Sequence, residues 1–310
     1  MALKIVHTKN VKWIDIVNPD EQDLLYLKEN FKFHPLDFDD IATPSTRVKI
    51  DEYDSYHFII LLFPIFNKER GEIKPAEIDF LIGKNYVITI HDGSIKTLTN
   101  LVHNVHQYDN IRNQYLVDGP GFLLFSILEL LFKRSGPILD KINSDINESG
   151  KNVFELSIDT LEKMSKLKKN IIIYRRIMKM HGYVLSKLAR STKDYLVFKD
   201  AKTYFQNLIE YAENIWDVLT ADKESVESFE DTNQSLGTHR INDILQVLTV
   251  LSVIISVLAL CTDIMIFFER TNIEKSLGLG SDFHLFLFIT TVLSILTAVL
   301  LYFFKRRKWL

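Results

Sequence analysis

Polar side chains recur at seven-residue intervals in an otherwise apolar stretch near the C-terminus. The recurring positions are Asn242, Thr249, Ser256 and Asp263. At this spacing they lie along one stripe of a helix, on which Leu245, Ser252 and Ala259 fill the intermediate positions. Carboxylate, amide and hydroxyl oxygens are the ligands that hard divalent cations prefer. In a symmetric oligomer the stripe would form rings around a shared axis, and a ring of carboxylates selects for cations.

The stripe has a second interpretation, because small residues such as Ser, Thr and Ala also let membrane helices pack closely. Close packing does not explain Asp263, since an ionised carboxylate inside a membrane span is costly and usually faces a partner or a water-filled path. We expect Asp263 to face a pore and to bind the cation. The alternative is a structural hydrogen bond, or a position just outside the hydrocarbon.

Two apolar runs predict two membrane spans, at about 244–268 and 283–304. Gln246 and Asp263 are the only strongly polar residues of the first run, and His284 is the only ionisable residue of the second. Each run reaches the roughly 20 residues that a helix needs to cross a bilayer. A buried helical hairpin in a soluble protein is the alternative.

The charges around these runs predict the orientation. A basic group at 305–308 follows the second run, whereas the loop at 269–282 is slightly acidic. Because basic residues favour the cytoplasmic side, we expect a multi-pass protein of the cell membrane with both termini in the cytoplasm. The start, "MALKIVHTKN", lacks the apolar core of a secretory signal.

The regions before the spans differ in pattern. Residues 1–120 predict a cytoplasmic α/β domain, with a hairpin turn at Gly83, Lys84 and Asn85 and a helix that begins after Asn18 as cap. Residues 121–241 predict a helical region with a stalk helix, and residues 242–310 a transmembrane domain. One helix could run from about Asp200 through Phe268, and oligomerisation would cover its exposed faces.

The stalk helix is rich in acid, and Asp217, Glu224 and Asp231 repeat at seven residues. Such charges usually mark a solvated helix face. The alternative is a field that concentrates or senses cations near the inner mouth of a pore.

Other chemistry has little support. "HPLDFDDI" at 34–41 brings His34, Asp37, Asp39 and Asp40 together, but it has neither a zincin pattern nor EF-hand spacing. The chain lacks phosphate-binding, nucleophile-elbow and dinucleotide fingerprints, so we expect no enzyme and no resident cofactor. The net charge of -3 argues against nucleic acid as a partner. Cys261 is the single cysteine, which excludes an intramolecular disulfide.

The chain resembles the CorA family of divalent-cation channels and transporters along nearly its whole length. The similar segments are "VKWIDIVNPDEQDLLYLKENFKFHPLDFDDI", "NDILQVLTVLSVI" and the ending "YFFKRRKWL". The resemblance implies an α+β cytoplasmic funnel, a long stalk helix that continues as the pore-lining span, and a peripheral second span. It also implies a homopentamer in membrane lipid that takes up Mg²⁺ passively, with Co²⁺ or Ni²⁺ as possible passengers and Zn²⁺ in one branch.

The resemblance assigns roles to individual residues. Asn242 matches an asparagine at the cytoplasmic mouth of the pore, and Leu245 and Leu248 fall on a hydrophobic constriction. Asp231 matches an acidic residue of the stalk, and we predict Asp231 and Asp263 as the metal-binding residues. The pore-lining set that we predict is Asn242, Leu245, Leu248, Thr249, Ser252, Ser256, Ala259 and Asp263.

Two departures from the family pattern bear on function. The Gly-Met-Asn signature is missing, and Ile266, Phe267 and Phe268 occupy its place. The acidic pair that senses intracellular Mg²⁺ in the family falls on Asn67 and Asn207. We therefore expect Asp263 to replace the signature's asparagine ring in part. The alternative function is a degenerate membrane scaffold or regulator without transport, in which the phenylalanines plug the outer mouth.

Overall fold

A computed structural model describes residues 3–43, 47–151, 153–154 and 157–271, together with residues 288, 291–292, 294–299 and 302. Contacts divide the chain into two units, Met1–Asp231 and Thr232–Leu310. Each unit is described by itself below.

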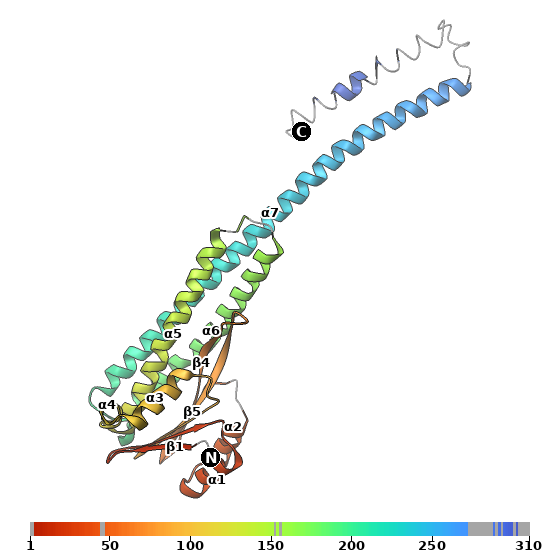
Figure 1. The fold of residues 1–310 in the computed structure, drawn as a ribbon. Coiled ribbons are helices and arrows are strands. Elements are labelled where there is room, and N and C mark those ends of the chain that lie inside the picture. The colour runs from red at the N-terminus through yellow and green to blue at the C-terminus, as the bar shows by residue number, and fades with distance from the viewer. Residues whose placement is uncertain are drawn as a thin grey trace. The chain divides into compact units, whose positions relative to one another are not determined.

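The first unit contains a mixed six-stranded sheet with helices on both faces (Figure 1). The strands lie in the order β1-β2-β6-β5-β4-β3, and only β2 and β6 pair in parallel. The strands are β1 (Leu3–His7), β2 (Lys12–Val17), β3 (Lys49–Glu52), β4 (Tyr56–Asn67), β5 (Glu72–Gly83) and β6 (Tyr86–His91). The tight turn between Gly83 and Tyr86 confirms the predicted hairpin.

Helices α1 (Glu21–Asn30) and α2 (Pro35–Ala42) cover one face of the sheet. Leu27 and Phe38 pack there against Phe58, Ile60 and Leu81. Because successive strand residues point to opposite faces, β4 can be apolar throughout and serve two cores.

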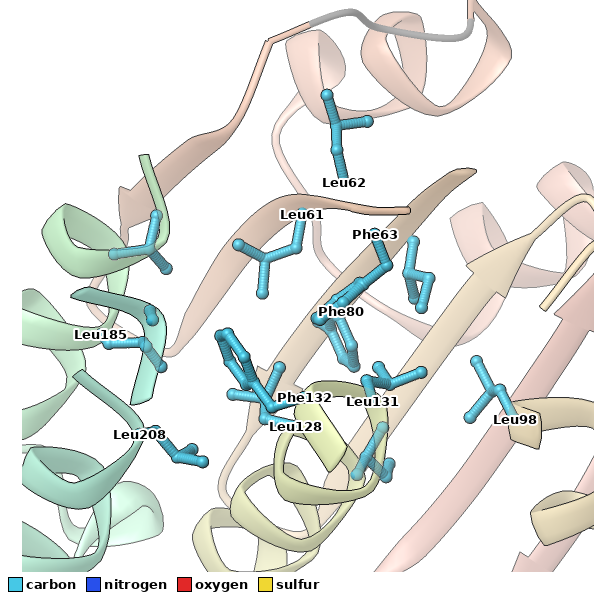
Figure 2. Close-up of a cluster of buried hydrophobic side chains, with 14 of the residues drawn as sticks. Leu61, Leu62, Phe63, Phe80, Leu98, Leu128, Leu131, Phe132, Leu185 and Leu208 are labelled. Carbon is cyan, nitrogen blue, oxygen red and sulfur yellow. The ribbon is translucent and has the colours of Figure 1, made fainter. Parts of the chain in front are cut away.

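The opposite face packs against α3 (Lys96–Gln107), α5 (Gly119–Lys151) and α6 (Ile158–Arg190). Figure 2 shows Leu61, Phe63 and Phe80 of the strands beside Leu128, Leu131 and Phe132 of α5. The short α4 (Asp109–Leu116) joins α3 to α5, and the 3-10 turn η1 (Asp194–Leu196) follows α6. This larger core supports the start of the last long helix.

Helix α7 (Ala201–Thr271) has 71 residues and confirms the predicted long helix. At 1.5 Å per residue it is about 105 Å long. In the first unit its apolar residues recur every three or four positions and are buried in the large core: Phe205, Leu208, Ile209, Ala212, Ile215, Leu219 and Val226. Of the predicted second span, the residues that are described are helical.

The predicted cap of the first helix was wrong. Asn18 has a φ of 52° and lies before the helix, whereas Asp20 caps it. The Asp20 carboxylate accepts from the Asp23 amide at 2.8 Å, and Asp23 accepts from the Asp20 amide at 3.3 Å. The two reciprocal hydrogen bonds between Asp20 and Asp23 form a capping box, which fixes the helix start two residues after Asn18.

Candidate functional site

Among the residues that the structure describes, α7 is the helix long and apolar enough by itself to cross a membrane. The bent pair α4 and α5 passes the same test of composition only if the two helices count as one span. The apolar residues of α5 are largely buried in the core of the first unit, so this pair is better explained as core. The part of α7 in the second unit is therefore the candidate site.

The predicted stripe lies on an exposed face of α7. The eight predicted pore-lining residues, from Asn242 to Asp263, are all exposed. Val250 is buried, with 4% of its surface exposed, and Gln246, Val253 and Val257 are half-buried. These covered positions follow stripe positions by one residue, which is about 100° around the helix. The stripe residues are therefore more exposed than these neighbouring positions of the helix.

The hydroxyl groups of the stripe donate their protons to carbonyl groups of the helix, which leaves their oxygen lone pairs free to accept. Thr249 donates to the Leu245 carbonyl at 2.7 Å, and Ser252 and Ser256 donate to the Leu248 and Ser252 carbonyls, each at 2.8 Å. Each hydroxyl proton is thus satisfied within the helix, as an apolar surrounding requires. The oxygen lone pairs remain available on the exposed side, and lone pairs are what a cation needs.

A shallow groove runs along this face of α7. It is lined by Leu245, Leu248, Thr249, Ser252, Val253, Ser256, Val257 and Leu260. Leu245 and Leu248 line one end of the groove, hydroxyl residues line its middle, and Leu260 lies at its other end. Over about four turns of the helix, the two leucines that the resemblance assigns to a constriction thus precede the hydroxyl groups.

Asp263 stands at the far end of the stripe, with its side chain exposed. It has no hydrogen bond or ion pair with any other described residue. Within the described part of the chain, no three His, Cys, Asp or Glu side chains come together to hold a metal ion. Among the described residues, one copy of the chain therefore supplies a single carboxylate at this level of α7.

The residues at the signature position continue the same helix. Ile266 is 46% exposed and Phe267 is 57% exposed. The side chain of Phe268, the loop at 272–282 and the basic tail lie outside the described residues. The outer end of the stripe is thus bordered by large apolar groups.

The acidic residues of the stalk fall into three groups, which the sequence did not separate. Glu227 pairs with Lys223 at 2.7 Å and Glu230 with Lys168 at 2.6 Å. Asp222 is buried, and burial raises the pKa of its carboxyl to about 6. The seven-residue repeat remains exposed, and its members are Asp217, Glu224 and Asp231. This repeat, like the exposed Glu210 and Glu213 of the same helix, can present charge to a partner or an ion.

The two asparagines at the family's sensing positions differ in role. The Asn67 side-chain oxygen accepts from the Glu69 and Arg70 amides at 3.0 and 3.1 Å, and so holds the turn between β4 and β5. Asn207 is exposed on α7. The Asn67 side chain therefore stabilises this turn, which gives an amide at this position a structural role.

The "HPLDFDDI" segment forms a structural cluster. His34 caps α2, and the buried Asp37 accepts from the Tyr53 hydroxyl at 2.9 Å and from that of Tyr56. Asp40 pairs with Lys49. These carboxylates are therefore held by hydroxyl and ammonium groups of the chain.

Comparison with known proteins agrees with this architecture. The family model for the CorA-like Mg²⁺ transporter protein matches residues 8–306. The cobalt/magnesium transport protein CorA of Thermotoga maritima is 23% identical over 302 residues, which are 96% of this chain and 83% of that protein. The putative metal ion transporter YfjQ of Bacillus subtilis is 24% identical over 78% of this chain and 73% of its own length.

Solved structures share the fold. The complete CorA magnesium transporter from Methanocaldococcus jannaschii superposes with a TM-score of 0.80 at 20% identity, over 98% of this chain and 94% of that chain. The full-length CmaX protein superposes with a TM-score of 0.73 at 13% identity, over 98% and 90% of the two chains. The predicted fold, an α+β domain with a long stalk helix, is confirmed.

The match begins directly after β1 and ends within the basic group at 305–308, so it includes most of the sheet unit and the whole candidate span. The matched family is one of transporters, which confirms the prediction that the chain is not an enzyme. The chain belongs to the CorA-like Mg²⁺ transporter family.

Proposed function

We propose that this protein conducts divalent metal cations passively across the cell membrane, through an axial pore lined by α7 in a homopentamer. Mg²⁺ is the expected cargo, and Co²⁺, Ni²⁺ and Zn²⁺ are further candidates. Family membership supports the proposal, as does the description of the Thermotoga maritima relative as a cobalt/magnesium transport protein. The metal ion is cargo, and the proposal includes no resident cofactor.

The observation that carries the proposal is the exposed polar stripe on α7. Asp263 and the hydroxyls of Thr249, Ser252 and Ser256 share one face of a helix that is otherwise apolar enough for a membrane. Exposure of a carboxylate to hydrocarbon is costly, so this face needs a hydrated surrounding. Five copies around an axis would turn the stripe into a water-lined path with a ring of five carboxylates.

The driving force follows from electrostatics. The membrane potential contributes about 2.3 kcal/mol per elementary charge per 100 mV, so a divalent cation gains about twice that amount on entry. The chain lacks a nucleotide-binding fingerprint, in agreement with passive transport. Residues 1–120 and 121–241 would lie in the cytoplasm, and residues 242–310 would cross the bilayer twice with both termini inside.

The absence of the Gly-Met-Asn signature shapes the proposed selectivity. An amide ring receives a hydrated ion, whereas the carboxylate ring of Asp263 would bind a cation more strongly and favour partial dehydration. Phe267 and its neighbours would narrow the outer mouth. Asp231 would contribute negative charge on the cytoplasmic approach.

The proposal is tested with purified full-length protein in liposomes, with flux of Mg²⁺, Co²⁺, Ni²⁺ and Zn²⁺ measured under an imposed potential. Asp263→Asn should reduce divalent flux at least about tenfold, because loss of a desolvated charge contact costs more than about 1.4 kcal/mol. The matched control is Thr262→Val, which removes a polar group one residue away from the stripe.

Equal flux in the Asp263→Asn variant and the wild type would contradict the proposed role of Asp263. Wild-type liposomes without any divalent flux would instead favour the alternative function, a membrane scaffold or regulator whose outer mouth is plugged.

A further inference from the structure

A second cleft lies within the sheet unit, on the face covered by α1 and α2. It has a volume of about 600 Å³ and lies where the start of α1 and the end of α2 approach β4, β5 and β6. The described residues that line the cleft include no Lys or Arg. Five of them are acidic: Asp20, Glu21, Glu77, Asp79 and Asp92. Apolar side chains, among them Leu24, Ile41 and Ile90, form the rest of the wall.

Asp79 is the unusual member of this cleft. It is 4% exposed, and its Oδ1 atom is buried without a hydrogen-bond partner. Burial raises the pKa of the Asp79 carboxyl well above its ordinary value, and the charges of Glu77 and Asp40 raise it further. A carboxyl group in such a place is expensive to ionise unless a donor of opposite charge joins it.

Three of the neighbouring polar groups are engaged with other atoms of the described chain. Asp20 caps α1, and Asp92 accepts from the Ser94 amide at 2.9 Å. Both ring nitrogens of His91 are engaged, one as acceptor from the Gly93 amide at 3.0 Å and the other against Asp15 at 3.1 Å. The wall therefore offers acceptors and negative charge to whatever enters.

The geometry selects an organic cation over a bare metal ion. Glu77 and Asp79 are two residues apart on one strand face, so their attachment points are about 7 Å apart. No three acidic, histidine or cysteine side chains of the described residues converge as metal ligands. The cleft is also much larger than an ion and has apolar walls, against which methylene groups can pack.

We propose that this cleft binds an aliphatic di- or polyamine, with the ammonium group of the ligand donating to Asp79 and its methylene chain lying along the apolar wall. The site lies in the sheet unit, and its existence does not depend on the transport proposed for α7.

Binding in this way is coupled to a proton. The empty cleft keeps Asp79 protonated over a pH range in which an ordinary aspartate is ionised, because burial disfavours the charged form and the charges of Glu77 and Asp40 oppose it. An ammonium ligand favours the ionised form, so it must displace that proton. Amine affinity should therefore rise with pH as long as Asp79 is protonated in the empty cleft and the amine itself remains protonated.

The test uses full-length protein in detergent, with spermidine and putrescine as probes in calorimetric titrations and thermal melts at constant ionic strength. Wild type should bind with an affinity that rises with pH and should melt at a higher temperature with amine. Asp79→Asn should lose at least about tenfold in affinity, the cost of a charged hydrogen bond. Glu29→Gln is the matched control, because it removes an exposed charge from the same helix α1 outside the cleft lining, and it should retain binding.

Three outcomes would overturn the proposal: no amine binding to the wild type, an equal loss in Asp79→Asn and Glu29→Gln, or an Asp79-dependent shift produced equally well by MgCl₂. The absence of binding would exclude the site. An equal loss in both variants would mean that amines are attracted by the overall negative charge and not by Asp79. An equal shift with MgCl₂ would mean that the cleft binds a metal ion. Should Asp79→Asn fail to fold, the pH dependence of amine affinity in the wild type decides, and an affinity independent of pH would overturn the proposal.

Discussion

Individual carboxylates of α7 have different roles because their surroundings differ. Glu227 and Glu230 are neutralised by lysines, whereas Asp217, Glu224 and Asp231 remain exposed. Asp222 is buried against α5, where the Asn143 side chain, with its amide nitrogen turned toward the carboxylate, donates at 3.1 Å. One neutral donor does not compensate a buried charge, which explains the raised pKa.

Asp222→Asn should stabilise the protein above pH 6. The pKa of Asp222 rises from its model-compound value of 3.8 to about 6 on folding. Between these two pH values the folded state binds more protons than the unfolded state, so stability falls as pH rises, and the loss is complete above about pH 6. The variant should therefore gain about 1–3 kcal/mol at pH 7.5 and nothing at pH 3.5.

Thermal melts of both proteins between pH 3.5 and 8 measure this difference. Glu224→Gln is the control at an exposed position of the same helix, and its melting temperature should follow that of the wild type. A gain for Asp222→Asn that is the same at every pH would contradict the burial argument.

At the level of single residues, the sequence predicts the stripe but not the second cleft. The stripe is periodic along one helix, so its exposed face follows from spacing alone. Asp79 lies in an apolar strand beside residues that are distant in sequence, and no local pattern shows that Asp20, Asp79 and Asp92 line one cavity. The sequence predicts Asn18 as the cap because proline is common at the first helical position and Pro19 follows it, whereas the helix begins two residues later, after Asp20.

The elements of the fold are held by close backbone approaches as well as by side-chain packing. Near the start of α5, a Cβ atom placed on Gly121 would lie 2.7 Å from the Leu196 carbonyl oxygen of η1. Backbone atoms cannot yield as a flexible side chain would, so this contact requires glycine. By contrast, a Cβ atom on Gly182 of α6 would meet nothing within 4 Å.

Gly121→Ala should destabilise the sheet unit by about 1–3 kcal/mol, because α5 and η1 must separate. Gly182→Ala is the matched control in a helix interior of the same unit, and it should stabilise by about 0.5–1 kcal/mol through better helix propensity. Denaturant or thermal unfolding of the two variants measures both values. Equal changes in the free energy of unfolding for the two variants would show that the close contact between Gly121 and η1 does not require glycine.

Sequence patterns predicted most elements because their signals are local. Glycine and asparagine at 83–85 locate the hairpin, and the scarcity of helix breakers after residue 200 predicts α7. The pairing of β2 with β6 is not local, since it joins residues more than 70 positions apart, and neither the strand order nor the parallel pair could be derived from periodicity.

For the whole molecule, the proposed function requires an assembly. Among the described residues, the stripe hydroxyls and Asp263 lie on an exposed face of α7, and one carboxylate cannot form a ring. The homopentamer that we propose would supply the other carboxylates. Native mass spectrometry or light scattering of the full-length protein in detergent should give a mass of five chains, and a monomeric protein in mild detergent would contradict the axial pore.

The central claim is that one face of α7 lines an ion path, and thiol chemistry at single positions tests it most directly. In a background with Cys261→Ser, Ser252→Cys and Ser256→Cys would each place one ring of thiolates in the path. Thiolates bind the soft cation Cd²⁺ tightly. Low concentrations of Cd²⁺ should then block Mg²⁺ flux into liposomes in both stripe variants, and Leu258→Cys, exposed on another face, should remain insensitive. Block at Leu258→Cys without block at the serine positions would contradict the account.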